Sequence, residues 1–379
     1  MAPLLGALLV VVFVFGGFGG LVAFIIWWAR RQQQQRDQAW GAVAAQLGLG
    51  YAPGRIYGRR HGQPVQLTTV TRGSGKSQQT YTVASSPLEV PLDLGLSVRA
   101  HGFFEDLFRG GGDIVVGDPV FDSRFLVQAD EEHRARAALT PRLRGLLRPP
   151  VPSGTALALS DSGCVVECRG TCDYPPWLIA AIELAAQASA ELARARAAVP
   201  VATPLAPYAS AWASYARARG LQGLDTPLCM WGTLEGVALR AYAVRAGRLC
   251  YALEIQVGLP QPLGLGLQIR PQHTFDRLSS LFGAQDIELG DPPFDGAFVV
   301  KAHEPAAVRE LLDAPTRATL LAVHQSVGAL SVSDDGLTVR LPQLGRDPAV
   351  VPRTAEKLAA VGDALSRRRQ RQPEIGPYR

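Results

Sequence analysis

Two aspartate-containing phrases in the chain have residue types that could do acid–base or metal chemistry. GDPVFDSRFLV begins at Gly117 and GDPPFDGAFVV begins at Gly290, with both aspartates and both phenylalanines in the same places. Carboxylates can bind a metal ion or act as a catalytic acid and base. An aspartate before proline also favours a turn, because proline restricts the preceding residue and aspartate bonds its own backbone. The phrases are therefore either a repeated active site or a repeated turn.

The surroundings of the two phrases favour the turn, because no histidine or further carboxylate accompanies both copies. We expect the phenylalanines to anchor the following strand and the second aspartate to cap or bridge the bend between them. The sequence thus predicts a duplicated structural motif and no catalytic, cofactor-binding or metal-ligating residues. The residues of the motif are Gly117, Asp118, Phe121, Asp122, Phe125, Gly290, Asp291, Phe294, Asp295 and Phe298.

The other sequence patterns are weaker indications of ligand binding or catalysis. GSGKS from Gly73 resembles the end of a phosphate-binding loop, but Val70 stands where the first glycine belongs and the following residues predict a strand. We expect a hairpin tip there. Cys164 and Cys168 on one strand would lie about 13 Å apart, whereas Cys172 could fold back, which leaves a redox role open. The six histidines are scattered, without a metalloprotease or serine-nucleophile motif.

An internal repeat organises these motifs. PLDLGLSVR at 91–99 matches PLGLGLQIR at 262–270, the aspartate phrases follow, and LSDSGCVVEC matches VSDDGLTVRL further along. Collinear matches of this kind indicate a tandem duplication. The sequence predicts a first domain at 40–196, a Pro-rich linker at 197–211 and a second domain at 212–366.

Each copy predicts the same order of elements. An amphipathic helix begins at Trp40 or Trp212, extended segments with turn residues follow, and the motif strand leads into a helix at Asp130 or His303. A short hairpin and an Ala-rich helix, at 180–193 or 355–365, close the unit. Neighbouring strands joined by short turns predict an α+β fold in which a mostly antiparallel sheet has flanking helices.

The N-terminal segment predicts a single transmembrane helix. Residues 3–28 are apolar throughout, and no Lys or Arg precedes them, which favours an uncleaved anchor at 1–29 over a signal peptide. The small residues Gly16 and Gly20 allow a homo-oligomer through this helix. A polar spacer at 30–39 and a basic tail at 367–379 flank the domains. We expect the membrane-interface residues to be Trp27, Trp28, Arg30, Arg31 and Arg36.

The charge and the cysteine content limit which functions and which cellular compartment we expect for the chain. The 38 Lys plus Arg against 33 Asp plus Glu give a formal charge of +5, too small for a dedicated nucleic-acid protein. Five cysteines without a dense pattern suit a reducing compartment. The positive-inside rule then places the two domains on the cytoplasmic side of a bacterial inner membrane.

The segment FDSRFLVQADEEHRARAALTPRLRGLL carries a resemblance. It is similar to a segment of a family of uncharacterised bacterial membrane-anchored proteins, a domain of unknown function, in which an F-D-x-x-F-x-V strand precedes an acidic helix start and L-T-P. The resemblance implies a membrane-tethered bacterial module and brings no activity or cofactor. The matching residues are Phe121, Asp122, Phe125, Val127, Asp130, Ala135, Leu139, Thr140 and Pro141.

The sequence therefore predicts a non-catalytic binding or scaffolding module with an unknown protein partner, no nucleic acid and no cofactor. Two alternatives remain open at this stage. The first is a membrane-anchored hydrolase with a site between the two domains. The second, which requires the reversed topology, is a periplasmic sensor.

Overall fold

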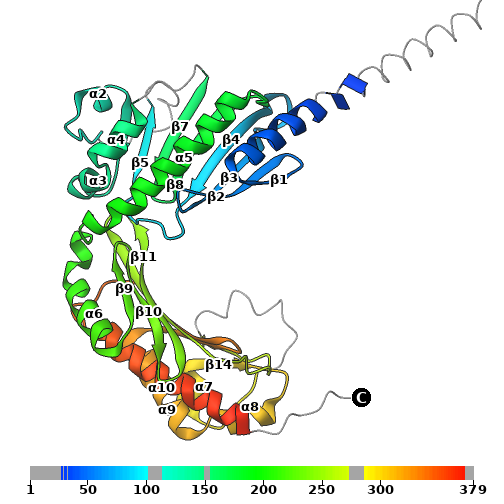
Figure 1. Cartoon of the computed structure of the whole chain (residues 1–379). Coiled ribbons are helices and arrows are strands. Elements are labelled where there is room, and N and C mark those ends of the chain that lie inside the picture. Colours follow the sequence, from blue (N-terminus) through cyan, green and yellow to red (C-terminus); the bar gives the residue numbers. More distant parts are fainter. Residues whose placement is uncertain are drawn as a thin grey trace, which may run out of the picture. The chain divides into compact units, whose positions relative to one another are not determined.

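The computed structural model of the chain describes residues 27–28, 30–31, 33–100, 113–148, 154–272 and 286–371. The chain divides into two compact units, Met1–Ala198 and Val199–Arg379. Each unit is an α+β domain with one antiparallel sheet of eight strands (Figure 1). The boundary falls inside the predicted linker, and residues 199–211 belong to the second unit, where Val199, Ala202 and Leu205 are buried.

The first unit opens with a helix at residues 33–47, which continues into a hairpin and a long meander. Its strands run in the order β1-β2-β3-β4-β8-β7-β5-β6 across the sheet, and every neighbouring pair is antiparallel. The strands are β1 Gly50–Ala52, β2 Arg55–Arg60, β3 Gln63–Arg72, β4 Gln79–Pro87, β5 Ser97–Ala100, β6 Phe125–Gln128, β7 Thr155–Ser160 and β8 Gly163–Arg169. The helices are η1 Gly75–Ser77, α2 Pro119–Asp122, α3 Glu132–Ala138, α4 Pro141–Leu147, α5 Pro175–Ala195 and η3 Arg196–Ala198.

The second unit repeats this plan, since its strand order β14-β13-β15-β16-β12-β11-β10-β9 is that of the first unit read from the other edge. The strands are β9 Gln222–Asp225, β10 Leu228–Leu234, β11 Val237–Gly247, β12 Cys250–Gly258, β13 Gln268–Pro271, β14 Phe298–Lys301, β15 Ala329–Ser333 and β16 Gly336–Leu341. The helices are η4 Thr203–Leu205, α6 Ala206–Arg219, α7 Pro292–Ala297, α8 Pro305–Leu311, α9 Ala314–Val327 and α10 Val350–Arg371.

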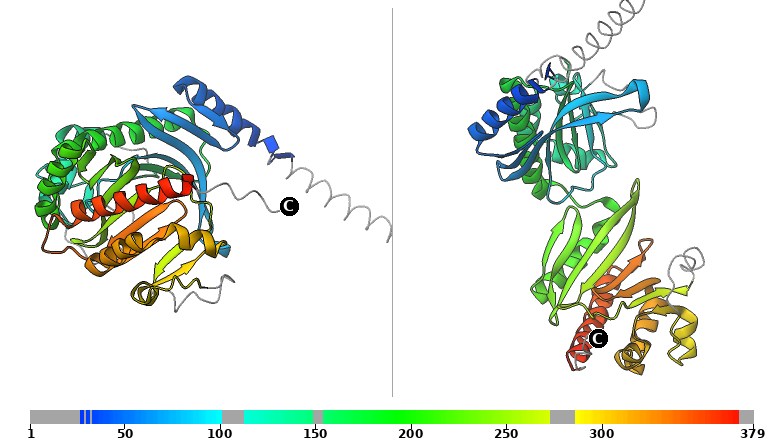
Figure 2. Two further views of the ribbon diagram at one scale, coloured as in Figure 1. Left: turned by 90° about the horizontal axis from the view of Figure 1, so that it is seen from below. Right: turned by 90° about the vertical axis from the view of Figure 1, so that its right-hand side faces the viewer.

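The described helices of the first unit cover one face of its sheet. Helix α5 packs on β3, β4 and β8, and α3 and α4 pack against α5. In the right-hand view of Figure 2 these helices lie to one side of the strands. The strands alternate accordingly: β7 is buried at Thr155, Leu157 and Leu159 and half-buried between them. Period-2 burial of this kind is what a sheet with a single covered face requires.

The fold prediction needs a correction at the N-terminus. Within the described part of the chain, no helix is long and apolar enough to cross a membrane, so the transmembrane, single-pass term is not supported. The longest of these helices, α5 and α10, carry polar residues and pack on their own sheets. Residues 1–26 of the expected span, with Gly16 and Gly20, lie outside the described residues. The cytoplasmic placement of the domains stays a prediction.

The expected membrane-interface residues lie along a helix. The described residues of the predicted spacer at 30–39 are all helical, and the helix runs on to residue 47. The guanidinium of Arg31 lies 5.2 Å from the Trp27 ring centroid, and that of Arg36 lies 5.9 Å from the ring of the fully buried Trp40. Arg36 therefore packs on the first domain, whereas Trp27 and Trp28 are half exposed.

The C-terminal helix is longer than its Ala-rich sequence indicates. Helix α10 extends through Arg371, so the first residues of the predicted basic tail are helical. Arg368 donates to the carbonyl of Leu311 at 3.1 Å and to the hydroxyl of Thr316 at 2.8 Å, and it pairs with Asp313. A residue expected in a solvated tail thus ties α10 to α8 and α9.

Candidate functional site

The carboxylate of Asp122 closes the loop of the first aspartate phrase. It accepts backbone N–H groups from Val116 at 3.0 Å, Gly117 at 3.1 Å and Asp118 at 3.0 Å. Asp118 is the N-cap of α2 and accepts the N–H of Phe121 at 3.3 Å. Each carboxylate thus satisfies N–H groups that the bend leaves without intrahelical partners.

The second phrase has the same geometry. Asp295 accepts the N–H groups of Leu289 at 3.1 Å and Asp291 at 3.0 Å, and Asp291 caps α7 through the N–H of Phe294 at 3.4 Å. The ring centroids of Phe294 and Phe298 are 4.8 Å apart, as are those of the first copy. The ten motif residues therefore form two matching bends between buried rings.

Arginines neutralise the capping aspartates. Arg148 lies 2.7 Å from the Asp118 carboxylate and Arg144 lies 3.3 Å away, whereas Asp291 has Arg317 at 2.9 Å. The hydrogen bond from Arg148 lowers the pKa of Asp118, and the one from Arg317 lowers the pKa of Asp291. Both aspartates are thus held as anions by fixed cations, an arrangement that suits a structural clasp.

A second pair of structural carboxylates was not predicted from the sequence. Asp161 accepts the N–H groups of Leu94, Gly95 and Leu96 at 2.7–3.3 Å, and Asp334 does the same for Leu265, Gly266 and Leu267 at 2.8–3.2 Å. These are the aspartates of SDSG and SDDG, which the sequence indicates only as hairpin residues. They hold the irregular segment before β5 or β13.

The remaining chemical patterns lie apart from one another. GSGKS is the tip of the β3–β4 hairpin, with η1 at Gly75–Ser77. His61 pairs with Glu183 at 2.6 Å, and the His324 ring packs on Phe298. No group of three or more His, Cys, Asp or Glu among the described residues is placed to hold a metal ion.

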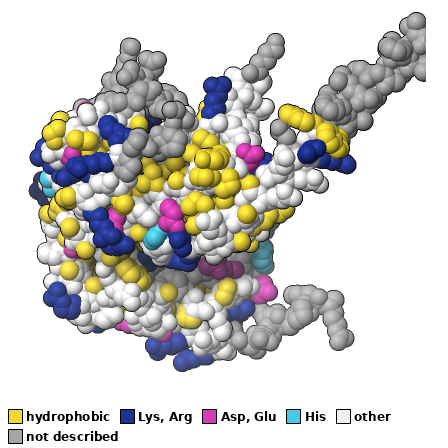
Figure 3. Space-filling model, turned by 45° about the horizontal axis from the view of Figure 1, so that its top comes forward, with side chains coloured by type: hydrophobic (Ala, Val, Ile, Leu, Met, Phe, Trp, Pro, Cys, Tyr) yellow, Lys and Arg dark blue, Asp and Glu magenta, His cyan; other side chains and the backbone are white. Residues whose placement is uncertain are grey.

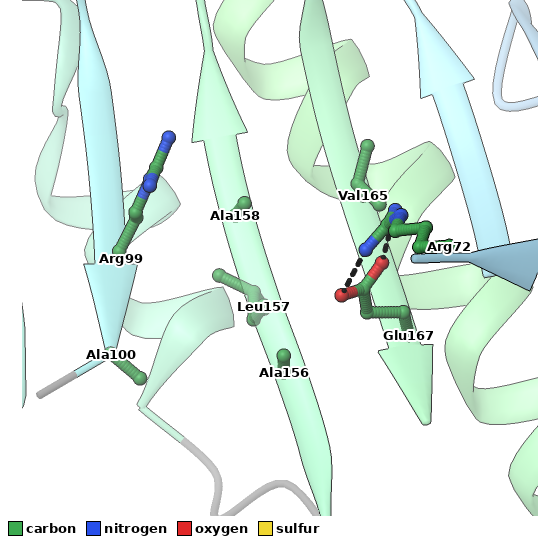
Figure 4. A pocket seen from close by; sticks show the side chains of 8 residues that line it. All are labelled: Arg72, Arg99, Ala100, Ala156, Leu157, Ala158, Val165 and Glu167. Atoms are coloured by element: carbon green, nitrogen blue, oxygen red, sulfur yellow. Dashed lines mark hydrogen bonds and ion pairs between the residues drawn. The ribbon is translucent and has the colours of Figure 1, made fainter. Parts of the chain in front are cut away.

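The face of the first sheet opposite α5, here called the open face, carries the candidate binding site. A hollow of about 290 Å³ lies over β5, β7 and β8 (Figure 4). Its middle is the strip of small side chains on β7, Ala156 and Ala158, with Val165 beside them on β8. Arg99 on β5 stands on one side of this strip, and Arg72 and Glu167 stand on the other (Figure 4).

An ion pair fixes one wall of the hollow. Arg72 donates to both oxygens of Glu167 at 2.9 and 2.8 Å, and its guanidinium lies 5.1 Å from the Tyr81 ring centroid. The Glu167 side chain is 12% exposed and Arg72 is 50% exposed. The hydrogen bond to Glu167 raises the pKa of Arg72. A bidentate pair held over a ring is a rigid wall rather than two loose side chains.

Arginine side chains stand on both sides of the hollow. Strand alternation places Glu167 and Arg169 on the same face of β8, and Arg169 is exposed. Arg72, Arg99 and Arg169 are the cationic side chains at or beside the hollow, and Glu167 is the carboxylate that pairs with Arg72. The hollow thus combines an apolar strip with guanidinium groups on both of its sides.

The open face of the second sheet differs at these positions. Arg340 takes the place of Glu167, and Tyr242 donates to Glu254 at 2.5 Å within a network that includes Gln256. A shallow groove of about 450 Å³ lies nearer the other end of this sheet, where its walls include Trp231, Arg240 and Asp335. The two units thus share a fold but not a site.

The residues around the hollow could not be found from sequence motifs. Arg72, Arg99 and Glu167 are 27 or more residues apart along the chain, and they meet only because β8 inserts between β4 and β7. Alternation along PVQLTTVTR and GCVVECR does place Arg72 and Glu167 on the face opposite the buried residues of each strand. The strand order that joins them is not encoded in alternation.

Comparisons with known proteins identify no family for the chain. No protein-family model matches the sequence, and no curated protein matches it. Among solved structures, the chain is similar to the crystal structure of the mycobacterial trehalose monomycolate transport factor A, with a TM-score of 0.29 and 13% identity over 43% of this chain and 97% of that one. A likeness at this level carries no argument about function. The predicted resemblance to a bacterial domain of unknown function stays a prediction.

Proposed function

We propose that the chain is a non-catalytic binding module whose first unit binds an acidic segment of a partner protein on the open face of its sheet. The observation that carries this proposal is the hollow between Arg99 and the Arg72–Glu167 pair, with its apolar strip and its guanidinium groups. Carboxylate side chains of a partner complement the arginines, and its apolar groups complement Ala156 and Ala158.

The interactions of the repeated aspartates favour a binding function over a catalytic one. In both copies the repeated aspartates accept backbone N–H groups or pair with arginine, so their lone pairs are engaged in holding loops. A general acid or base needs access to a reacting group. The hydrolase alternative has no support from these residues.

The distribution of cations favours a protein partner over a nucleic acid. On the surface drawn in Figure 3, Lys and Arg side chains lie in small separate groups, with acidic and hydrophobic side chains between them. A nucleic-acid surface needs cations that follow the phosphate backbone. A local pair of arginines beside small apolar residues suits a short acidic segment instead.

Site-specific photocrosslinking tests this proposal. A photoreactive phenylalanine analogue replaces Ala158, which lies in the hollow, or Ala180, which is exposed on the helix-covered face. We expect a discrete crosslinked protein from position 158 and none from position 180, with its crosslinked peptide rich in Asp and Glu. Crosslinks of equal yield from both positions, or a nucleic-acid adduct at position 158, would contradict the proposal.

A further inference from the structure

One cysteine of strand β8 lies between two threonines of the neighbouring strands. Cys168 lies opposite Thr82 of β4 and opposite Thr155 of β7 in the ladder. Its side chain shares the helix-covered side of the sheet with Cys164 and Val166, which are buried. Directly opposed side chains in an antiparallel pair have Cβ atoms about 5 Å apart, so Cys168 adjoins the Thr82 hydroxyl.

The chain then turns back over this position. Gly170, with φ of 88°, donates its N–H to the carbonyl of Thr80 at 2.7 Å. The Thr82 hydroxyl donates to the carbonyl of Gly170 at 2.9 Å and accepts the N–H of Cys172 at 2.8 Å. One threonine therefore bonds the backbone of Cys172 and lies opposite Cys168, which brings Cys172 next to Cys168.

The two thiols are also reachable. Cys168 and Cys172 are both half-buried, whereas Cys164 is 1% exposed. Burial, followed by the neighbouring Cys172, raises the pKa of Cys168 to about 11, and burial raises the pKa of Cys164 to about 12. Cys164 is therefore a packing residue, while the other two form an accessible dithiol.

We propose that Cys168 and Cys172 are a redox-active dithiol, which small disulfide compounds oxidise to an intramolecular disulfide. The site lies on the other face of the sheet from the hollow, because Cys168 directly follows Glu167 on the strand, and it is independent of the proposed binding function. The second unit has Leu341 in place of Cys168 and Gly345 in place of Cys172. The dithiol is therefore a feature of the first unit and not a requirement of the fold.

The reaction is ordinary thiol–disulfide exchange with a disulfide RSSR as oxidant. The Cys172 thiol loses its proton to solvent, and its sulfur attacks RSSR to form a mixed disulfide and release RS⁻. The Cys168 thiol then loses its proton, its sulfur attacks the Cys172 sulfur, and the second RS⁻ leaves. Two protein thiols are oxidised, and one RSSR is reduced to two RSH.

The raised pKa of Cys168 makes ring closure depend on pH. The thiolate is the attacking species. Its fraction at Cys168 rises about tenfold per pH unit below the pKa, so the second release of RS⁻ should accelerate by about that factor from pH 7 to pH 8.

Titration with 5,5′-dithiobis(2-nitrobenzoate) tests the proposal on the full chain carrying Cys229→Ser and Cys250→Ser. We expect the release of two thionitrobenzoate anions and no thionitrobenzoate left on the protein. Arg169 separates the cysteines, so trypsin without reductant should yield the peptide 145–169 linked to the peptide 170–194. The further variant Cys168→Ala should release one anion and keep the mixed disulfide on Cys172.

Matched variants make the result decisive. Cys164→Ala should behave as its parent, which shows that the linked peptide joins Cys168 and not Cys164. Circular dichroism spectra that match the parent would show that each variant is folded. A mixed disulfide that persists on Cys172 while Cys168 is present, or no reaction at either thiol, would overturn the proposal.

Discussion

The first and second units have one strand order but different surfaces on their open faces. In both, one aspartate closes the loop of the repeated phrase and another holds the segment before β5 or β13. On the open face, however, Glu167 of the first unit is replaced by Arg340. Interactions with the backbone are thus common to the two copies, whereas interactions between side chains on the open face are not. The shared residues specify the fold, and the proposed binding site uses residues that differ between the two units.

The helix that covers each sheet shows how one fold tolerates different contacts. Ser189 of α5 donates to the carbonyl of Ser86 at 2.6 Å and accepts the N–H of Cys164 at 3.0 Å. The matching residue of α10 is Gly362, where a Cβ atom would lie 2.9 Å from Val257. A hydrogen bond in one unit and close apolar packing in the other hold helix and sheet together.

The largest predicted effect is common to both units. Phe121→Ala and Phe294→Ala should each lower the free energy of unfolding by about 3–5 kcal/mol, because each ring is fully buried and its removal leaves a cavity. Denaturant unfolding measures this loss. Val120→Ala is the control, since Val120 is 54% exposed and should change stability by less than about 0.5 kcal/mol. Unequal losses for the two substitutions would contradict the conclusion that the two phenylalanines have the same structural role.

A smaller effect should follow replacement of the loop-closing aspartates. Asp122→Asn and Asp295→Asn should each lower the free energy of unfolding by about 1–2 kcal/mol, because an amide removes the charge that strengthens the N–H bonds. Partner binding by the folded variants should be unchanged. Undiminished stability together with lost binding would instead assign these carboxylates to a site.

The capping aspartates should give the smallest effect, visible only in acid. Their pKa values in the folded state are lowered by arginine, so their contribution to stability is present above the unfolded pKa of about 3.9 and is lost as the pH falls through the folded value. Asp118→Asn should therefore flatten the decline in stability below about pH 4. Asp291→Asn should flatten it less, because one arginine faces Asp291 and two face Asp118. Acid unfolding monitored by circular dichroism compares the two.

Much of the architecture follows from residue patterns. The duplication, the antiparallel pairing of PVQLTTV with QTYTVASS and the closing helices are local or repeated signals. Strands β1, β2, β9 and β10 were not predicted. The segments of β1 and β9, such as GYA, have only three or four residues, which are too few to show a period. Hydrophobicity alone predicted a transmembrane helix from the apolar N-terminal run, and no helix of the described residues is long and apolar enough to span a membrane.

The candidate site was less predictable than the fold. Its residues share no motif and come from β3, β5, β7 and β8, which are adjacent only in the folded sheet. The aspartate phrases attracted notice because they repeat, yet repetition marks what both copies need in order to fold. A residue specific to one copy, such as Glu167 or Cys172, carries no repeat signal.

The central claim is that the hollow of the first sheet binds an acidic segment, and a pair of matched substitutions tests it most directly. Arg99 and Arg270 occupy the same place in PLDLGLSVR and PLGLGLQIR, but Arg99 stands beside the hollow, whereas the groove on the second sheet lies nearer Trp231 and Arg240. The measurement is the Kd of a fluorescent ten-residue peptide of alternating Glu and Ala, with a Lys–Ala peptide as the control. We expect Arg99→Ala to raise the Kd about threefold to fivefold, the size of one exposed charge contact, and Arg270→Ala to leave it unchanged. Equal weakening by the two substitutions, or equal binding of the Lys–Ala peptide, would contradict the account.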